Sequence, residues 1–370
     1  MHILLDARMM GAERTRGIGR YLEELVRGLL TFPDIELTLL VRSRTGNTWK
    51  DEPRVKLVEA DVPWYGWKEQ LRMPGYLKRT KADVVHIPHW NVPLRFRKPF
   101  AMTIHDLILL HHPESAKIST RSSLVAKVKY WAFKKVLASA IKRASVIFVP
   151  TQFVADDIAT RFPKAKDKLM VTGEGVTPMP AREAEKPAQA PFLFYVGSAY
   201  PHKRLDLLLE AWSTLCLEHP TLQLVIAGEK DVFMQQYIWE AKARGLVRVH
   251  FVGTVSQASL VDYLDRATAF VFPSSDEGFG LPPLEALARG CPVICSDSSC
   301  LPEVLPTEGV IFFKSGDADD MIRGIETVLR EEQVYRSAAQ AHIPDLLARH
   351  DWVKAAERTR EGYERLVLKA

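Results

Sequence analysis

Two glutamates with seven residues between them, Glu277 and Glu285, have the spacing in this sequence that best suits a binding site. They lie in Asp276–Ala286, DEGFGLPPLEA, after the apolar run Ala269–Pro273, which predicts a buried strand, and before helix-forming residues that end at Gly290. A glycine turn between a strand and a helix exposes backbone N–H groups near the positive end of the helix dipole. An anionic or polyhydroxyl ligand suits such a turn, and carboxylates accept hydrogen bonds from sugar hydroxyls.

A second strand–glycine loop–helix pattern, Val196–Leu209, reads VGSAYPHKRLDLLL. His202, Lys203 and Arg204 stand just before its helix, where the helix dipole disfavours cations. This mismatch indicates an anion between the cations and the helix, such as a diphosphate. A chance pair of surface cations is the alternative.

Near the N-terminus, Gly17 and Gly19 in RGIGRY follow the first predicted strand. They give the first half of a dinucleotide-binding fingerprint, but Leu22 occupies the third glycine position and no acidic residue ends the second predicted strand near Val41. A Rossmann dehydrogenase is therefore disfavoured. These glycines either serve a loop that needs positive φ or allow the backbone to approach a ligand, and we favour the second.

Histidines end two apolar runs, in Asp83–Pro93 (DVVHIPHWNVP) and in Thr103–Asp106 (TIHD). Side chains at the carboxyl ends of parallel strands reach a ligand cleft, so His105 and Asp106 are candidate site residues. His86 better fits a packed histidine. A metal site is not favoured, because no fixed ligand spacing on one element relates the five histidines of this region, His86, His89, His105, His111 and His112.

The segment 116–150 carries eight lysines and arginines and no Asp or Glu, with aromatic and aliphatic residues interleaved. As a basic amphipathic helix, 116–143 could lie on an anionic bilayer, or it could bury its aromatic face in the first domain. Both interpretations stay open. Trp64, Tyr65 and Trp67 form a further aromatic cluster, suited to a sugar or lipid acceptor or to a core.

The composition is that of a globular protein too long for one core: 370 residues, 47% hydrophobic and 26% charged. A net charge of +5 without any nucleic-acid-binding motif argues against a nucleic-acid partner. The four cysteines lack zinc-site spacing and are expected to be reduced thiols. With no signal peptide and no apolar run of ~20 residues, we expect a cytoplasmic protein whose only membrane contact is peripheral, on the inner membrane face.

Strand-like runs alternate with helical patterns in both halves of the chain, which predicts an α/β fold with two parallel sheets. We expect a first domain at 1–172, a proline-rich linker at 173–191, a second domain at 192–350 and a final helix at 351–370. The expected strands are 2–5, 36–41, 55–58, 83–87, 100–104, 146–149, 168–171, 192–196, 222–227, 249–252, 269–272, 293–295 and 310–313. The expected helices are 18–30, 125–144, 205–217, 232–243, 260–267, 284–289, 321–329 and 352–368.

Together these stretches resemble the retaining, two-Rossmann-domain (GT-B) glycosyltransferases of family 4, the group 1 bacterial hexosyl- and mannosyltransferases. The resemblance spans nearly the whole chain and is most specific in Glu277-GFGLPPL-Glu285. Further matching stretches are PHKRLDLLLEAW (201–212), FVGTVSQASLVDYLDRATAFVFPSS (251–275), GCPVICSDSSCLPEVLP (290–306) and TIHDLILLHHPE (103–114). It implies two Rossmann-like domains that face each other across a cleft, with acceptor bound by the first domain and nucleotide sugar by the second. The final helix would cross back to the first domain.

The resemblance also implies roles for individual residues. Glu285 would hold the ribose of the donor, Glu277 the hydroxyls of the transferred sugar, and Lys203 the diphosphate. His105 would reach the sugar or the phosphate, so the catalytic set is Glu277, His105 and Lys203. The remaining donor-binding residues would be Gly17, Gly19, Ser198, His202, Arg204, Val252, Gly253, Gly278, Phe279, Gly280 and Leu281, and the acceptor side would include Asp106, His89 and Asn91.

The implied reaction transfers a hexose from a nucleoside diphosphate sugar to a growing, lipid-linked surface glycan, as in bacterial O-antigen polysaccharide synthesis. Mannose is the favoured sugar and GDP-mannose the favoured donor. Lys203 and the loop amides would stabilise the departing diphosphate, so neither a metal nor a cofactor is required. The alternatives are a sugar-nucleotide 2-epimerase of the same fold and a non-catalytic subunit that binds a sugar nucleotide.

Overall fold

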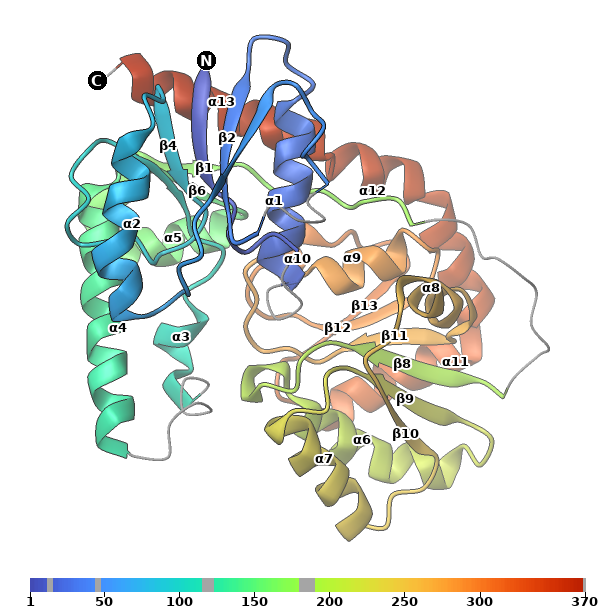
Figure 1. Ribbon diagram of the computed structural model, residues 1–370. Coiled ribbons are helices and arrows are strands. Elements are labelled where there is room, and N and C mark those ends of the chain that lie inside the picture. The colour runs from blue at the N-terminus through green and yellow to red at the C-terminus, as the bar shows by residue number, and fades with distance from the viewer. Residues whose placement is uncertain (12–15, 44–47, 115–122, 180–189, 369–370) are drawn as a thin grey trace. The chain divides into compact units, whose positions relative to one another are not determined.

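The computed structural model describes residues 1–11, 16–43, 48–114, 123–179 and 190–368 (Figure 1). The chain divides into two compact units. Unit 1 comprises Met1–Leu107, Thr120–Gly175 and His350–Ala370, and unit 2 comprises Ile108–Ser119 and Val176–Arg349. The short segment Ile108–Ser119 thus groups with the second unit, although the sequence placed it in the first domain. Part of the expected linker, 180–189, and the start of the basic segment, 116–122, lie outside the described residues.

The described residues of unit 1 form a seven-stranded, wholly parallel sheet in the order β3-β2-β1-β4-β5-β6-β7. The strands are β1 His2–Asp6, β2 Glu36–Val41, β3 Val55–Glu59, β4 Val84–Ile87, β5 Ala101–Thr103, β6 Val146–Val149 and β7 Leu169–Val171. Ile3 of β1 pairs with Leu37 on one side and Val84 on the other. The strand order therefore reverses between β1 and β4, and ligands of such sheets bind outside the carboxyl ends at this switch point.

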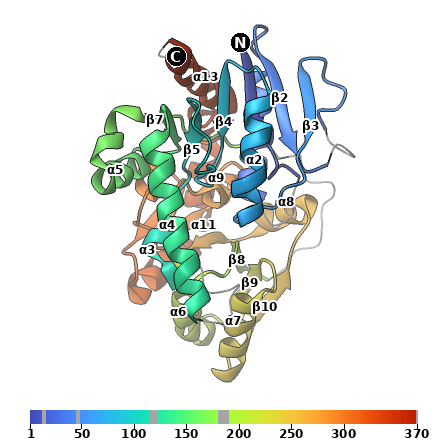
Figure 2. The same cartoon turned by 60° about the vertical axis from the view of Figure 1, so that its left-hand side comes forward.

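Helices cover both faces of the unit 1 sheet, as short crossovers between parallel strands require (Figure 2). They are α1 Arg16–Leu29, α2 Trp67–Arg79, α4 Ser123–Arg143, α5 Gln152–Arg161 and α13 Trp352–Leu368. The sequence did not predict α2 or α5. In α2, Pro74 and Gly75 interrupt the helical pattern, but Met73, Pro74 and Leu77 are buried and this packing outweighs the local preference.

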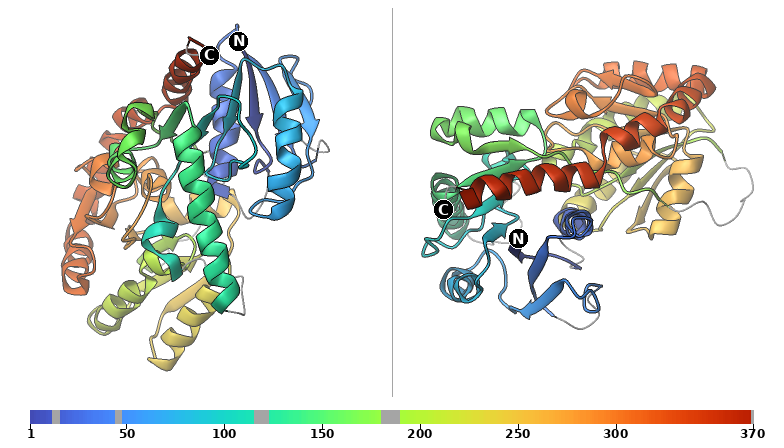
Figure 3. Two further views of the ribbon diagram at one scale, coloured as in Figure 1. Left: turned by 90° about the vertical axis from the view of Figure 1, so that its left-hand side faces the viewer. Right: turned by 90° about the horizontal axis from the view of Figure 1, so that it is seen from above.

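The C-terminal helix α13 is part of the unit 1 core. It lies against α1 and against β4, β5 and β6 (Figure 3). The approach is close, since a Cβ built at Gly28 of α1 would lie 2.7 Å from Ala356 Cβ. Tyr363 is fully buried, and its hydroxyl hydrogen-bonds His86 Nδ1 at 2.7 Å. His86 is fully buried, as predicted for a packed histidine.

The described residues of unit 2 form a six-stranded parallel sheet in the order β10-β9-β8-β11-β12-β13. Its strands are β8 Phe192–Val196, β9 Gln223–Ala227, β10 Val249–Gly253, β11 Ala269–Phe272, β12 Val293–Ser296 and β13 Val310–Phe313. The order reverses between β8 and β11, so the second sheet repeats the topology of the first. Two parallel α/β sheets confirm the predicted fold class.

The helices of unit 2 are α3 Ile108–His111, α6 Leu205–Glu218, α7 Val232–Ala243, α8 Gln257–Arg266, α9 Leu281–Leu287, α10 Leu301–Val304, α11 Ala318–Ala341 and α12 Ile343–Arg349. The expected bounds were wrong for α9, which begins three residues earlier than 284 because prolines 282 and 283 fit the first turn of a helix. They were also wrong for α11, which continues to Ala341 through a kink at Glu331. No described helix is both long and apolar enough to cross a membrane.

Candidate functional site

In unit 2, the two predicted chemical stretches meet at the switch point of the sheet. Lys203 follows β8 in the short 3-10 turn Pro201–Lys203, and Glu277 follows the neighbouring strand β11. The loops are tied together through His202, whose carbonyl oxygen accepts a hydrogen bond from the Ser275 N–H at 2.8 Å. The Ser274 hydroxyl donates to the same carbonyl at 3.2 Å. Residues 74 positions apart in the sequence thereby share one site.

Lys203 and Glu277 form a partly buried ion pair, with Nζ 2.5 Å from Oε1. Their side chains are only 15% and 10% exposed. The Glu277 backbone N–H donates to Ser299 Oγ at 3.1 Å, and the Lys203 ammonium lies over the Phe272 ring, 5.5 Å from its centre. A fixed ammonium beside a fixed carboxylate can bind a phosphate on one side and a sugar hydroxyl on the other.

The turn after Glu277 is built for a close backbone approach. Gly280 has φ +93°, and a Cβ there would lie 2.7 Å from Leu301 Cδ2. Gly278 and Phe279 are buried, and Leu281 opens α9. Glu285 lies one turn into α9 and is 7% exposed. Both glutamates of the predicted pair are thus buried carboxylates, a state that requires polar or cationic partners.

His202 and Arg204 flank Lys203, but His202 differs from it in charge and Arg204 in its ion-pair partner. Burial, and then the neighbouring Lys203 and His112, lower the pKa of His202 to about 3, so its ring is neutral at physiological pH. Its Nδ1 is buried without a hydrogen-bond partner among the described residues. Arg204 adopts a left-handed conformation, and its guanidinium pairs with Asp206 at 3.1 Å. Lys203 is the cation of this trio that lies against Glu277.

Three other predicted donor residues lie at strand ends of the same sheet. Ser198 follows β8, and its carbonyl oxygen accepts a hydrogen bond from the Tyr195 hydroxyl at 2.7 Å. Val252 and Gly253 close β10, and Gly253 has φ +77°. They belong to the edge strand, two strands away from β8.

Sequence reasoning missed the residues that anchor α3 beside Glu277. Asp276 Oδ2 lies 2.6 Å from His111 Nδ1 and 3.5 Å from His112 Nε2. Burial raises the pKa of Asp276, although both histidines act to lower it. The sequence suggested these histidines only as weak metal candidates, and nothing in their local pattern pointed to an aspartate more than 160 residues away.

In unit 1, His105 is held by a glutamate that the sequence did not single out. His105 Nδ1 lies 3.0 Å from Glu174 Oε1, and the ring packs edge-on against Tyr21. Glu174 is 7% exposed. A carboxylate at Nδ1 fixes the ring orientation and favours the tautomer with the proton on Nδ1. The other nitrogen, Nε2, is buried without a hydrogen-bond partner among the described residues, which leaves an acceptor for a ligand.

The two N-terminal glycines lie in the first turn of α1 rather than in a loop, and neither has positive φ. A Cβ at Gly19 would lie 2.8 Å from the Met9 carbonyl oxygen, whereas Gly17 is exposed with open space around it. The positive-φ explanation is therefore wrong for both. A glycine is required at position 19 because the Met9 carbonyl oxygen lies so close, whereas no neighbouring atom requires a glycine at position 17.

The predicted acceptor-side residues also lie at carboxyl strand ends of unit 1, after β4 and β5. Asn91 is 3% exposed and donates through Nδ2 to Glu69 Oε1 at 2.5 Å. Burial and the nearby His105 lower the pKa of His89 to about 3. Asp106 is partly exposed and directly follows His105. His89 and His105 thus share one neighbourhood at the sheet edge.

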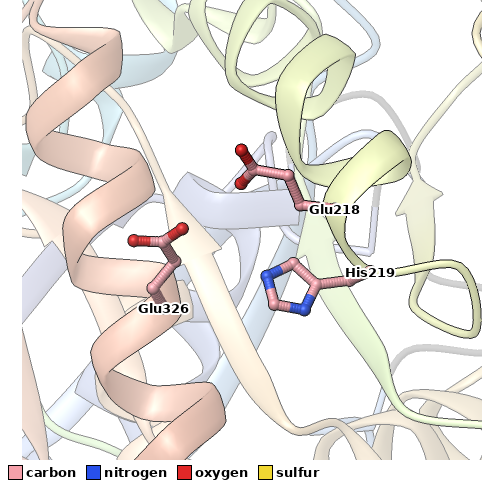
Figure 4. Close-up of side chains that lie close together, drawn as sticks. All are labelled: Glu218, His219 and Glu326. Atoms are coloured by element: carbon pink, nitrogen blue, oxygen red, sulfur yellow. The ribbon is translucent and has the colours of Figure 1, made fainter.

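One group of side chains within the described residues has the spacing of a metal site, namely Glu218, His219 and Glu326 (Figure 4). The carboxylates and the ring converge from the end of α6 and from α11. Lys203 precedes the other end of α6, which has 14 residues and is therefore about 20 Å long. This surface cluster is separate from the Glu277 site, and the histidines 86, 89, 105, 111 and 112 form no such group in the described structure.

Comparisons with known proteins agree with this architecture. The sequence model of "Glycosyl transferases group 1" matches residues 181–343, and that of "Glycosyltransferase Family 4" matches residues 15–178. The O-antigen chain mannosyltransferase RfbU of Salmonella typhimurium is 26% identical over 313 residues, which are 83% of this chain and 78% of that protein. The O-antigen chain mannosyltransferase B of Escherichia coli is 25% identical over 384 residues, covering 95% and 96%.

Among solved structures, the sucrose-phosphate synthase of Thermosynechococcus elongatus superposes with a TM-score of 0.78 at 19% identity, covering all of both chains. This likeness establishes the GT-B type of fold. The two family matches together cover almost the whole chain, and their boundary falls between the two sheets. The chain belongs to the group 1 glycosyltransferases of family 4.

Proposed function

We propose that this enzyme transfers a mannosyl residue from GDP-mannose to a hydroxyl of a growing, lipid-linked surface glycan, with retention of configuration. The observation that carries the proposal is the Lys203–Glu277 ion pair beside the Gly280 turn and Glu285, at the switch point of unit 2. The mannosyl donor is inferred from the names of the O-antigen mannosyltransferases that match most of the chain.

The site residues account for the chemistry of the departing diphosphate. Negative charge grows on the diphosphate as the glycosidic bond breaks, and Lys203 Nζ with the amides of residues 279–281 would stabilise it. Glu285 would hold the ribose, and Glu277 would accept hydrogen bonds from hydroxyls of the transferred sugar. On this proposal the charge is met by Lys203 and backbone N–H groups, without a resident metal or cofactor.

Retention follows if the acceptor attacks the same face from which the diphosphate leaves. The acceptor hydroxyl would then pass its proton to the departing phosphate oxygen while the sugar carbon is oxocarbenium-like. No enzyme carboxylate is needed as a nucleophile, because both glutamates have binding roles. His105, with Nδ1 fixed by Glu174, would offer Nε2 to the sugar or the phosphate.

A thermal-shift panel of GDP, UDP, dTDP and their hexose conjugates tests the donor. A ligand at 100 times its dissociation constant stabilises by about 2.7 kcal/mol. We expect GDP and GDP-mannose to give the largest shifts, followed by mannosyl transfer to α-linked mannosides with an α product by NMR. Turnover of UDP-GlcNAc to the C2-epimeric sugar without an acceptor would favour a 2-epimerase, and nucleotide binding without any transfer would favour a binding subunit.

We further propose that α4 rests on the membrane that carries the acceptor. Its inner face packs through Phe133 against Trp90, with ring centres 4.6 Å apart. Its first turns leave Val125, Val128 and Trp131 44%, 59% and 56% exposed. This half of α4 extends beyond the strands of its own sheet (Figures 2 and 3). Exposed apolar side chains among lysines suit an anionic bilayer surface.

Vesicle flotation tests this contact. We expect flotation with vesicles containing anionic lipid, a loss of flotation at high salt, and a loss in Trp131→Ala. Trp239→Ala removes a tryptophan that is 77% exposed on α7 and serves as the matched control. Equal flotation of both variants and of the wild type, or none at all, would leave α4 with a packing role only.

A further inference from the structure

Tyr65 of unit 1 has a backbone conformation that bulky residues rarely adopt. Its φ is +58°, and its side chain is 53% exposed. The left-handed region is sterically unfavourable for a tyrosine, and such strain persists only where surrounding contacts impose it. Burial of the ring in a core does not explain the strain, since about half of the residue faces solvent.

A buried ionic network imposes this conformation. The Tyr65 N–H donates to Glu69 Oε2 at 2.9 Å, and Glu69 is 1% exposed. Arg8, 2% exposed, donates to Glu69 Oε1 at 2.7 Å and to both oxygens of Asp6 at 2.8 and 2.7 Å. Asn91 donates to the same Glu69 oxygen. Four buried polar residues, from β1 and the segment after it, from α2 and from the segment after β4, thus form a network that reaches the Tyr65 N–H through Glu69.

The network presents the Tyr65 ring beside two other rings at the carboxyl edge of the sheet. Tyr65 stacks on Trp90, with ring centres 5.1 Å apart and an angle of 22°. His89 packs edge-on against Tyr65 at 5.8 Å. Trp90 and His89 follow β4, and Arg8 follows β1, so the rings lie at the switch point of the unit 1 sheet, where ligands of this topology bind.

Polar groups border this aromatic surface. Loss of hydration at the Tyr65 hydroxyl, together with the carboxylates of Glu69 and Asp106, raises the pKa of Tyr65. Asp106 follows β5, the neighbour of β4 in the sheet, and comes directly after His105. An apolar ring face next to a carboxylate and a hydroxyl matches a pyranose, which has one face of C–H groups and hydroxyls around its rim.

We propose that Tyr65 and Trp90 form a stacking platform for a pyranose ring of the acceptor glycan, held in place by the Arg8–Glu69 network. The proposal rests on the transferase function above and assigns its acceptor subsite to unit 1. Asp106 borders the platform and accepts hydrogen bonds from hydroxyls of the stacked sugar. Glu69 and Asn91 position Tyr65 and do not touch the sugar.

The test separates the role of the ring from its role in stability. Tyr65→Gly removes the ring and also the steric cost of positive φ, so we expect unchanged or higher thermal stability. Binding of α-linked mannotriose, measured by titration calorimetry, should weaken about tenfold, because the variant loses the stacking contact and the apolar area that this contact buries. Tyr65→Phe keeps the ring and should bind within about threefold of the wild type. Trp239→Ala is the control for loss of an exposed aromatic residue.

GDP binding is measured on the same samples, so that a failed subsite is distinguishable from a failed function. Weaker mannotriose binding with unchanged GDP affinity supports the platform. A Tyr65→Gly variant that binds mannotriose as the wild type does overturns it, and so does a fall in thermal stability that accounts for the loss. The proposal is also overturned if the wild type binds none of mannotriose, maltotriose and chitotriose at 10 mM, whether or not it binds GDP.

Discussion

Replacing Lys203 by methionine removes the ammonium and keeps most of the side-chain volume. In the protein, Glu277 would then be a carboxylate that is 10% exposed and has lost the cation 2.5 Å away. Breaking one side of a fully buried pair costs about 3–5 kcal/mol, so we expect about 2–3 kcal/mol at this slightly exposed site. The double variant Lys203→Met/Glu277→Gln should recover most of this loss, because no unpaired charge remains.

The same variant should lose affinity for phosphate but not for the nucleoside. A charge-assisted contact to a diphosphate contributes about 2–4 kcal/mol, which corresponds to GDP binding about 30- to 1,000-fold more weakly. Guanosine lacks the diphosphate and should bind Lys203→Met and wild type equally. Glu277→Gln removes the carboxylate that competes for Lys203, so its GDP affinity should equal or exceed that of the wild type while mannosyl transfer falls.

Titration calorimetry with GDP and guanosine measures the affinities, urea unfolding measures the stabilities, and a transfer assay measures mannosyl transfer, all on the same three variants. Two results would refute the reasoning. One is an unchanged GDP affinity in Lys203→Met. The other is an equal loss for GDP and guanosine, which would mean that Lys203 supports the fold of the site and does not contact phosphate.

Glu174→Gln keeps an oxygen for His105 Nδ1 but removes the charge; turnover should fall about tenfold or more at unchanged melting temperature, and unchanged kinetics would refute the positioning role. Gly362→Ala should destabilise the protein by about 1–3 kcal/mol in urea despite better helix propensity, because its Cβ would lie 2.3 Å from the Phe148 ring. In Gly75→Ala the added Cβ would have no atom within 4 Å, so better helix propensity should stabilise the protein by about 0.5–1 kcal/mol. Equal effects of the two substitutions on the free energy of unfolding would show that packing does not decide the sign. Burial of their rings lowers the pKa of three histidines to about 3, namely His86, His89 and His202. In the unfolded chain these histidines bind protons below about pH 6.5, so the free energy of unfolding should fall as the pH is lowered from there towards pH 3. Each histidine contributes a decrease of up to ~1.4 kcal/mol per pH unit. An equal free energy of unfolding in urea titrations at pH 7, 6 and 5 would contradict this.

The local sequence was sufficient for the strands and for the chemistry that lies on contiguous stretches. Ala269–Phe272 and Val310–Phe313 have the predicted bounds, because a buried parallel strand is a short, continuous apolar run. Glu277, the glycine turn and Glu285 are close in sequence, so their spacing alone indicated a sugar-binding turn. The start of α9 depended on two prolines that suit the first turn of a helix. The existence of α2 depended on burial that outweighs the proline inside it.

The tertiary structure decided which distant side chains act together. Glu174 lies 69 residues from His105, and Glu69 lies 61 residues from Arg8. No periodicity or motif links such pairs. They meet because parallel strands far apart in the sequence end at the same edge of a sheet, where a buried charge persists only if the fold places a partner within hydrogen-bond reach. The sequence therefore determined the chemical groups available at each strand end, and the order of strands in the two sheets determined which of those groups share a site.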